Sequence, residues 1–433
     1  MVKRLSLICL ALAFCVGVGA QSLKQELKKN IHFSAGNLLA YPLPRQHTLT
    51  PAPEGRTAFY ISHYGRHGSR QQTRMADFEY VIYILQKAER KGMLSPLGAD
   101  VLNRVRAMRD DVGYRAGDLT RLGAYQHREI ARRMVERFPS VFQPGTLVDA
   151  RSSTTIRCVL SMNSALMQMM QQKPTLKFYQ DASLADLYYL AVTDRDLQMR
   201  AATVENKDVY KAFCQKHARW QRVVEQLFSD ADYVSTHVNG ERLNYHLFRL
   251  ASGLQNSELG TQVTLYDLFN DDEIYHNWLR ENAFWYLSYA FTPLNGAEQP
   301  YLARHLLRRI ITQADSCIAL PHTSVHLRFG HDTMVLPLVC LLGLDGYDFS
   351  TDDLEQLEKH QWVNYRIFPM AGNVQFVFYR RDAQDSDVLF KVLLNENEAT
   401  LPLQTDMAPY YHWKDFRDYY LPLLNTYGEQ HDQ

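Results

Sequence analysis

A histidine flanked by two arginines stands within residues 63–70, which read HYGRHGSR. The segment directly follows an apolar stretch over 58–62 (AFYIS), whose pattern predicts a buried strand, and α/β folds place ligand-binding loops at strand ends. Arginine forks match phosphate oxygens in bidentate fashion, and a histidine among them, His67, is suited to attack phosphorus. Taken alone, the pattern fits a basic surface loop equally well.

Two further segments repeat this combination of a strand end, polar side chains and a helix start. Residues 151–157 (RSSTTIR) follow a predicted strand over 145–150, and residues 329–333 (FGHDT) follow a predicted strand over 324–329. An arginine at a helix start can bind an anion, and a His-Asp pair offers one phosphate ligand and one proton donor. Each segment also has a purely structural interpretation, an exposed arginine or an aspartate N-cap. The three segments together favour an anion site.

These segments resemble the signature of the histidine acid phosphatases, which is R-H-G-x-R near the start, an intervening R-S-x-x-x-x-R and a late H-D pair. Residues 119–126 (LTRLGAYQ) also resemble the L-T-x-x-G-x-x-Q of that family. Within the family, residues 336–343 (LPLVCLLG) and 392–396 (VLLNE) are most similar to the multiple inositol polyphosphate phosphatases. That branch usually carries His-Ala-Glu where this chain has His331-Asp332-Thr333, and Pro where this chain has Gln72. The substrate therefore stays open.

The resemblance implies a role for each residue of the site. His67 is expected to attack phosphorus and form a phosphohistidine, and Asp332 is expected to protonate the leaving alcohol and then activate water. The expected phosphate ligands are Arg66, Arg70, Arg157 and His331. No metal or other cofactor is expected, because the arginines supply the positive charge and the motifs lack metal-ligand spacing.

Contacts beyond the reacting phosphate are predicted at two places. Arg74 follows the histidine segment and is a candidate for binding a second phosphate. A run of cations within residues 207–222 either lines the mouth of the site or forms a solvated helix face. The run consists of Lys207, Lys211, Lys216, His217, Arg219 and Arg222.

Strand and helix patterns alternate at both ends of the chain. Besides the strands above, the periodicity predicts helices over 121–138, with Thr120 as N-cap, over 154–172 and over 333–344. Paired strands are predicted over 374–379 and 388–394, with a turn at residues 395–397.

The middle of the chain is rich in Tyr, Trp and charged residues and poor in strand patterns. This predicts an α/β core interrupted by an α-rich insertion. With the resemblance, the expected fold is a three-layer α/β/α core with a mixed central sheet, similar to the phosphoglycerate mutases. Residues 21–173 and 315–433 are expected to form this core, and residues 174–314 a mostly helical cap.

The first twenty residues have the layout of a secretory signal. Lys3 and Arg4 precede an apolar run over 5–16, and small residues lead to a predicted cleavage after Ala20. The run is short for a membrane anchor, and the bulky residue before Cys15 disfavours a lipoprotein. We therefore expect an exported protein, located in the periplasm, at the outer membrane or outside the cell, with no membrane-spanning segment after signal removal.

Four cysteines lie beyond this signal, namely Cys158, Cys214, Cys317 and Cys340. An even number in an exported protein allows disulfides, and buried free thiols are the equal alternative. The chain has no Asn-x-Ser/Thr sequon, which favours a bacterial envelope protein over a glycosylated secretory one.

The 433 residues include 47 Lys+Arg and 47 Asp+Glu, so the formal net charge is zero. This argues against a nucleic-acid partner, which normally requires a basic surplus. It does not exclude an anionic small molecule as substrate, because a few arginines in one site can bind an anion whatever the net charge of the chain. The leading prediction is a secreted phosphomonoesterase for inositol polyphosphates such as phytate. The alternatives are a broad acid or sugar-phosphate phosphatase and a non-catalytic protein that binds phosphate or phosphoinositide.

Overall fold

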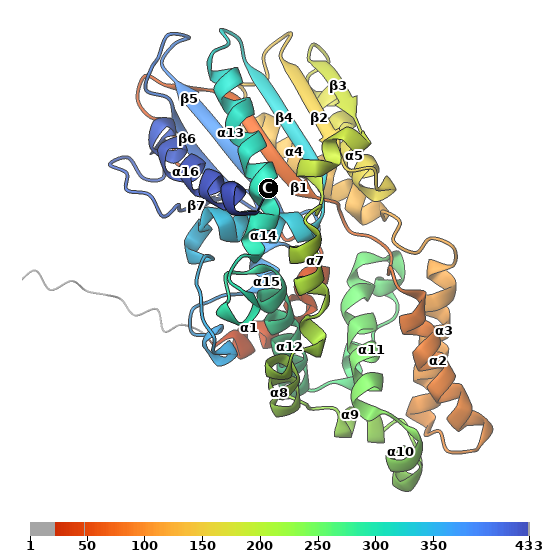
Figure 1. The fold of residues 1–433 in the computed structure, drawn as a ribbon. Coiled ribbons are helices and arrows are strands. Elements are labelled where there is room, and N and C mark those ends of the chain that lie inside the picture. Colours follow the sequence, from red (N-terminus) through yellow and green to blue (C-terminus); the bar gives the residue numbers. More distant parts are fainter. Residues whose placement is uncertain (1–21, 47, 432–433) are drawn as a thin grey trace, which may run out of the picture.

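The structure, a computed structural model, describes residues 22–46 and 48–431. A mixed sheet of eight strands occupies the upper part of the molecule in Figure 1, and a largely helical part lies below it. The predicted secretory signal over 1–20 lies outside the described residues.

The sheet has the strand order β3-β2-β4-β1-β5-β6-β7, with β8 paired to β6. The strands from β3 to β1 run parallel to one another, whereas β5, β6, β7 and β8 pair in antiparallel fashion. The strands are β1 (Thr57–Arg66), β2 (Leu147–Ser152), β3 (Lys177–Asp181), β4 (Ser324–Gly330), β5 (Asn373–Arg380), β6 (Leu389–Leu394), β7 (Asn397–Ala399) and β8 (Tyr411–His412).

Helices cover both faces of the sheet, and side chains alternate between them with the period of two that a strand dictates. Phe376 and Phe378 of β5 pack on the face that carries α13, α14 and α16, whereas Val377 and Tyr379 pack on the face of α4 and α5. The predicted three-layer α/β/α core with a mixed sheet is confirmed. These helices are α4 (Arg121–Arg137), α5 (Ile156–Gln172), α13 (Arg304–Ile318), α14 (Asp332–Leu342) and α16 (Trp413–His431).

The local elements expected near the motifs all form. The strands predicted before the three motifs are β1, β2 and β4, and the predicted strand pair is the antiparallel pair β5 and β6. Thr120 is the N-cap of α4, since its hydroxyl accepts a hydrogen bond from the Gly123 amide at 3.2 Å. Capping by a threonine of this kind satisfies one of the free amides of the first helical turn.

The helical part contains a second apolar core, in which α2 and α3 pack against α9, α10 and α11 (Figure 1). Within the range 174–314, β3 joins the edge of the sheet, and the rest is helix and connecting loop. The division of the chain at residues 174 and 314 stays a prediction. The remaining helices are α1 (Leu23–Lys29), α2 (Met75–Arg90), α3 (Pro96–Val112), α6 (Leu187–Leu190), α7 (Arg195–Ala202), α8 (Asp208–Lys216), α9 (Gln221–Glu225), α10 (Ala231–His237), α11 (Gly240–Gly253), α12 (Asp271–Tyr289) and α15 (Asn364–Ile367), with a 3-10 segment, η1, at Ile31–Leu38.

The four cysteines beyond the predicted signal are free and buried. The sequence allowed either disulfides or buried free thiols. In the structure, all four of these cysteines are free thiols. Within residues 22–46 and 48–431, no helix combines the length and the apolar character needed to cross a membrane.

Candidate active site

Three parallel strands end together at one edge of the sheet, and each leads into one of the motifs. β1 ends at Arg66, which lies opposite Gly330, the last residue of β4. β2 ends at Ser152, opposite Phe329 of β4. The three motifs therefore meet at the carboxyl edge of the parallel strands, where open α/β sheets bind their ligands.

The loop after β1 is held against the start of α4. The Ser69 backbone donates to the Gln126 side chain at 2.8 Å, and its carbonyl accepts from the Thr120 backbone at 2.9 Å. A Cβ on Gly68 would lie 2.4 Å from the Gly123 carbonyl oxygen, so only glycine allows this approach. The predicted L-T-x-x-G-x-x-Q segment thus has a structural task, which is to fix the loop that carries the histidine.

His67 is a buried imidazole with one nitrogen committed to the backbone. Its Nδ1 lies 2.9 Å from the Gly68 carbonyl oxygen, so Nδ1 carries the proton and Nε2 keeps its lone pair. Burial and the charges of Arg66, Arg157 and Arg70 hold the pKa of His67 well below its usual value. A lowered pKa favours the neutral ring, the form in which Nε2 can act as a nucleophile.

Arg66 is fully buried, and only part of its guanidinium is satisfied by the protein. Nη1 donates to the backbone oxygens of Asn37 and Phe368 at 2.5 and 2.8 Å. Nη2 forms an ion pair with Asp332 at 2.7 Å. Nε has no hydrogen-bond partner in the described part of the chain. A buried N–H without a partner can donate a hydrogen bond to a ligand.

The other two arginines among the predicted phosphate ligands complete a positive cluster. Arg157 is the second residue of α5 and is half-buried, and its Nε also lacks a partner among the described residues. Arg70 is buried, and burial together with the charge of Arg66 lowers the pKa of its guanidinium to about 9. Packing like charges together is costly, so the cluster favours an anion that neutralises it.

His331 brings the starts of two helices together. It is the N-cap of α14, and its Nε2 lies 3.3 Å from the hydroxyl of Thr155, the N-cap of α5. Two helix N-termini, each with a partial positive charge, thus lie side by side. Burial lowers the pKa of His331 to about 4. Its ring centroid lies 5.6 Å from that of His67.

Asp332, the first residue of α14, is positioned by a residue that no motif contains. Its Oδ2 accepts from the Asn37 side-chain amide at 3.2 Å in addition to the ion pair with Arg66. Burial raises the pKa of Asp332, but Arg66, His331 and Arg70 outweigh it and leave this pKa below its usual value. Asn37 lies in η1, 29 residues before Arg66, and nothing in its sequence context indicates this role.

The cations predicted within residues 207–222 pair mainly with neighbouring acidic groups. Lys216 and His217 contact Glu355, Arg219 contacts Asp272, and Arg222 contacts Glu273. These contacts match the solvated-face interpretation of the run. Arg74 is exposed at the N-cap of α2, and its charge helps to lower the pKa of Asp77.

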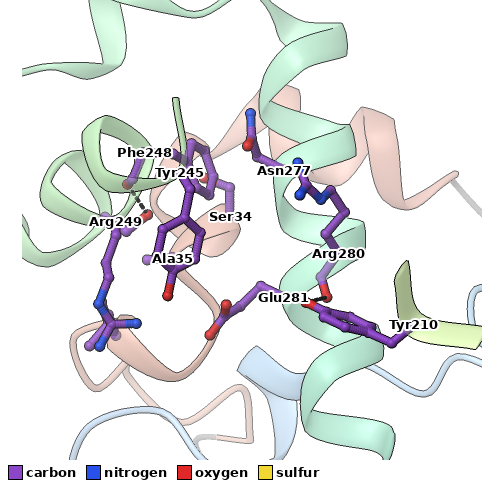
Figure 2. A pocket seen from close by; sticks show the side chains of 11 residues that line it. Ser34, Ala35, Tyr210, Tyr245, Phe248, Arg249, Asn277, Arg280 and Glu281 are labelled. Carbon is purple, nitrogen blue, oxygen red and sulfur yellow. Dashed lines mark hydrogen bonds between the residues drawn. The ribbon is translucent and has the colours of Figure 1, made fainter. Parts of the chain in front are cut away.

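A small cavity of about 50 Å³ lies between η1, α11 and α12 (Figure 2). Its wall includes Leu38, which follows Asn37, and Arg249 near the end of α11. The Arg249 Nε forms an ion pair with Asp77 at 3.0 Å, and Asp77 also accepts from the Gln72 side chain at 3.2 Å. The cavity is thus linked to the loop of the histidine through a single carboxylate.

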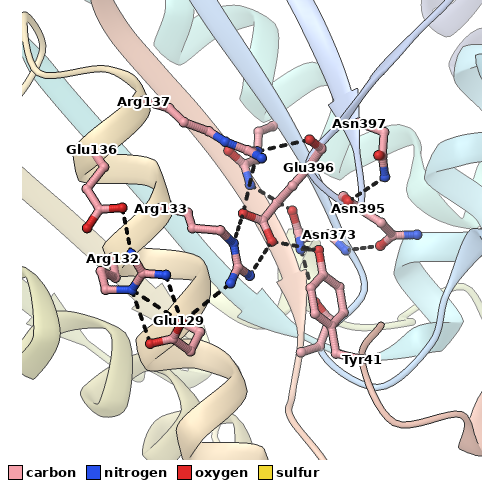
Figure 3. Close-up of polar contacts among 12 residues, drawn as sticks. Tyr41, Glu129, Arg132, Arg133, Glu136, Arg137, Asn373, Asn395, Glu396 and Asn397 are labelled. Atoms are coloured by element: carbon pink, nitrogen blue, oxygen red, sulfur yellow. Dashed lines mark hydrogen bonds and ion pairs between the residues drawn. The ribbon is translucent and has the colours of Figure 1, made fainter. Parts of the chain in front are cut away.

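A second group of arginines, on α4, contacts the turn after β6 (Figure 3). Arg133 on α4 binds both carboxylate oxygens of the buried Glu396, at 2.9 and 2.7 Å. Glu396 also accepts from Tyr41 at 3.1 Å, and Tyr41 accepts from the Asn373 amide at 3.1 Å. Asn373 begins β5 and follows the loop 368–372, whose backbone binds the backbone of Arg66 and His67.

The fold and this histidine-arginine site define a histidine phosphatase. A family model of the histidine phosphatase superfamily (branch 2) matches residues 65–395, and the chain belongs to this superfamily. Members of this family act on small-molecule phosphates, so the match supports a phosphatase. A comparison with curated protein sequences gave no match.

Solved structures of similar fold include three phosphatases of different organisms. The multiple inositol polyphosphate phosphatase of Bifidobacterium longum, complexed with inositol hexasulfate, has a TM-score of 0.71 at 17% identity, covering 89% of this chain and 96% of that chain. The phytase from D. castellii has a TM-score of 0.63 at 14% identity, covering 90% and 84%. The Hafnia alvei phytase complexed with tartrate has a TM-score of 0.50 at 15% identity, covering 85% and 97%. At these identities the likeness concerns the fold.

Proposed function

We propose that this protein hydrolyses phosphate monoesters of inositol polyphosphates such as phytate, with His67 as the nucleophile. The observation that carries the proposal is a buried imidazole whose Nδ1 lies 2.9 Å from the Gly68 carbonyl oxygen, with its pKa lowered by burial and by the charges of Arg66, Arg157 and Arg70. The unpartnered Nε groups of Arg66 and Arg157 supply donors for the oxygens of the phosphate.

The proposed reaction uses His67 as the nucleophile and Asp332 as the proton donor. The Nε2 lone pair of His67 attacks phosphorus while the bond from phosphorus to the leaving oxygen breaks. Asp332 gives its proton to that oxygen, so the product leaves as a neutral alcohol. Water then attacks the phosphohistidine and passes a proton to Asp332, which releases inorganic phosphate and restores both groups.

The positive cluster lowers the barrier of both steps. Charge in a phosphoryl transfer spreads over the three non-bridging oxygens. Donors that are already in place need no reorganisation when that charge develops. Arg66, Arg70, Arg157 and His331 are the proposed ligands of these oxygens, and the two helix N-termini add to their field.

The pKa shifts predict an acidic optimum. The pKa of His67 is strongly depressed, so acid does not protonate the nucleophile until well below ~6.5, the usual histidine value. Asp332 must hold a proton to act as an acid, and Arg66 holds its pKa down in the free protein. A bound phosphate neutralises Arg66 and so raises the pKa of Asp332. Activity is therefore expected to fall as the pH rises through the pKa of Asp332 in the substrate complex.

The substrate class has support from the fold and from the site. One protein of similar fold binds inositol hexasulfate, a sulfate analogue of phytate, and others are phytases. The site described above is strongly cationic, as a polyanionic substrate requires. The layout of the first twenty residues supports export, so the proposed enzyme acts outside the cytoplasm.

The test is phosphate release from phytate, glucose 6-phosphate and p-nitrophenyl phosphate between about pH 3 and pH 8, a span that brackets the ordinary aspartate and histidine pKa values. We expect phytate to have the highest kcat/KM, with activity greatest on the acidic side. Equal or better turnover of glucose 6-phosphate would favour a broad phosphatase instead. Release from none of the three would favour a binding protein.

A further inference from the structure

The cavity between η1, α11 and α12 has an unusual polar wall. Arg249 comes from α11, Glu281 comes from α12, and the hydroxyl-bearing ring of Tyr245 lies between them in Figure 2. The cavity volume is about 50 Å³, whereas a single water needs roughly 10–15 Å³ on this kind of measure. The space therefore suits one tetrahedral oxyanion or a few waters.

We propose that Arg249 binds a second phosphate of the substrate and so sets the preference for polyphosphates over monophosphates. The proposal rests on the proposed function, because it assigns a further contact in the same site. Arg249 is charged, and its side chain is 19% exposed, so a ligand can reach it. The planar guanidinium of arginine can also donate two parallel hydrogen bonds to the oxygens of a phosphate.

Two sets of contacts connect Arg249 to the elements of the candidate active site. The first is the carboxylate of Asp77, whose Oδ2 accepts hydrogen bonds from both Arg249 and Gln72. Gln72 lies two residues after Arg70, and Arg249 is among the charges that lower the pKa of Arg70. An anion on Arg249 would therefore lie within the field of the catalytic arginines.

The second set is a row of side chains on α12 that runs from the cavity towards the proton donor. The Trp285 indole donates to Glu281 at 2.9 Å, and its ring stacks on Tyr289 with centroids 5.4 Å apart. α12 also packs against α14, the helix that Asp332 begins, and the charge of Asp332 helps to raise the pKa of Tyr289. α12 thus links the wall of the cavity to the helix of Asp332.

Glu281 makes the site selective and supplies an opposite charge for the test. Its carboxylate repels an anion in the cavity, while it can accept a hydrogen bond from a ring hydroxyl. A ligand that places one phosphate on Arg249 and a hydroxyl near Glu281 suits both groups. The ligand class is a polyol that carries at least two phosphates.

The experiment measures competitive inhibition of p-nitrophenyl phosphate hydrolysis by myo-inositol hexakissulfate and by inorganic phosphate. Arg249→Gln should raise the Ki of the hexakissulfate at least about tenfold, the loss expected for one charge-assisted contact, and leave the Ki of phosphate nearly unchanged. Glu281→Gln should lower the Ki of the hexakissulfate about threefold, because a repulsion is removed.

Arg104→Gln is the matched control. Arg104 on α3 also pairs with an aspartate, Asp267 at 2.8 Å, and its side chain is 15% exposed, but it does not line the cavity. The control variant should change neither Ki. An equal change of both Ki values in Arg249→Gln, or no change, overturns the proposal, as does an unchanged or higher hexakissulfate Ki in Glu281→Gln.

The test of Arg249 does not depend on whether the protein hydrolyses phytate. If the wild-type protein does not release phosphate from phytate, the inhibition assay still reports on Arg249, because its reporter is p-nitrophenyl phosphate. If no substrate is turned over, calorimetric binding of the same two probes measures the same ratio between wild type and variant.

Discussion

Arg133 on α4 and Arg157 on α5 lie on neighbouring helices, yet their guanidinium groups have different surroundings. Arg133 meets both oxygens of Glu396, a carboxylate with only 2% of its side chain exposed. Glu396 lies in the tight turn between β6 and β7 with a φ of 64°, and Asn395 before it has a φ of 50°. The pairing with Arg133 holds a non-glycine residue in a strained turn.

Arg157 has no such partner in the described chain for its buried Nε. Burial, together with the charges of Arg157, Arg66 and Arg70, depresses the pKa of His67. The contrast shows how one residue type acquires two tasks. An arginine whose N–H groups all bind acceptors of the protein stabilises the fold. An arginine with an N–H group that lacks such an acceptor can bind a ligand.

The largest effect is expected at the centre of the unsatisfied cluster. His67→Ala removes the nucleophile, so kcat should fall by at least roughly 10⁴-fold. The Nδ1 contact of His67 is made within its own loop, so the melting temperature should change little. Phosphate release under saturating p-nitrophenyl phosphate is the measurement, with circular dichroism as the check on folding. Substantial remaining turnover would remove His67 from the nucleophile role.

The two arginines themselves should respond in opposite ways. Arg157→Gln should lower kcat about 10²–10³-fold, the usual loss when one transition-state donor is removed, with little change in the free energy of unfolding. Arg133→Gln should lower the free energy of unfolding by about 1.5–3 kcal/mol, the usual value of a hydrogen bond to a charged group, because the buried Glu396 loses its bidentate partner and keeps Tyr41 and the more distant Arg137. Its effect on kcat should be far smaller. Urea unfolding measures the free energy of unfolding of both variants, and steady-state kinetics measure their kcat. The same profile in both variants would contradict the comparison.

A smaller and substrate-dependent effect is expected at the one carboxylate of the catalytic cluster. Asp332→Asn removes the proton donor but keeps a group that can accept from Asn37. Turnover of phytate should fall about 10²-fold or more, whereas p-nitrophenyl phosphate, whose leaving group needs no proton, should lose less than about tenfold. Initial rates on the two substrates test this. Equal losses would show that Asp332 acts only by holding Arg66.

Most of the local structure near the site could be predicted from the sequence. The strands before the three motifs, the Thr120 cap and the β5–β6 pair follow from short-range patterns, because periodicity and capping are properties of neighbouring residues. Within residues 207–222, sequence alone could not choose between a ligand surface and a solvated face. The acidic partners of those cations come from distant segments, such as Glu355 and Asp272.

Residue types and their order along the chain determined the chemistry of this protein: a histidine, arginines and a His-Asp pair, each placed at a strand end. The tertiary structure decided which donors stay unsatisfied. Asn37 reaches Asp332 from 295 positions away, and Glu396 saturates Arg133 from 263 positions away. Such long-range pairing sets the burial, charge and free donors of each side chain, and these depend on distances that no local pattern encodes.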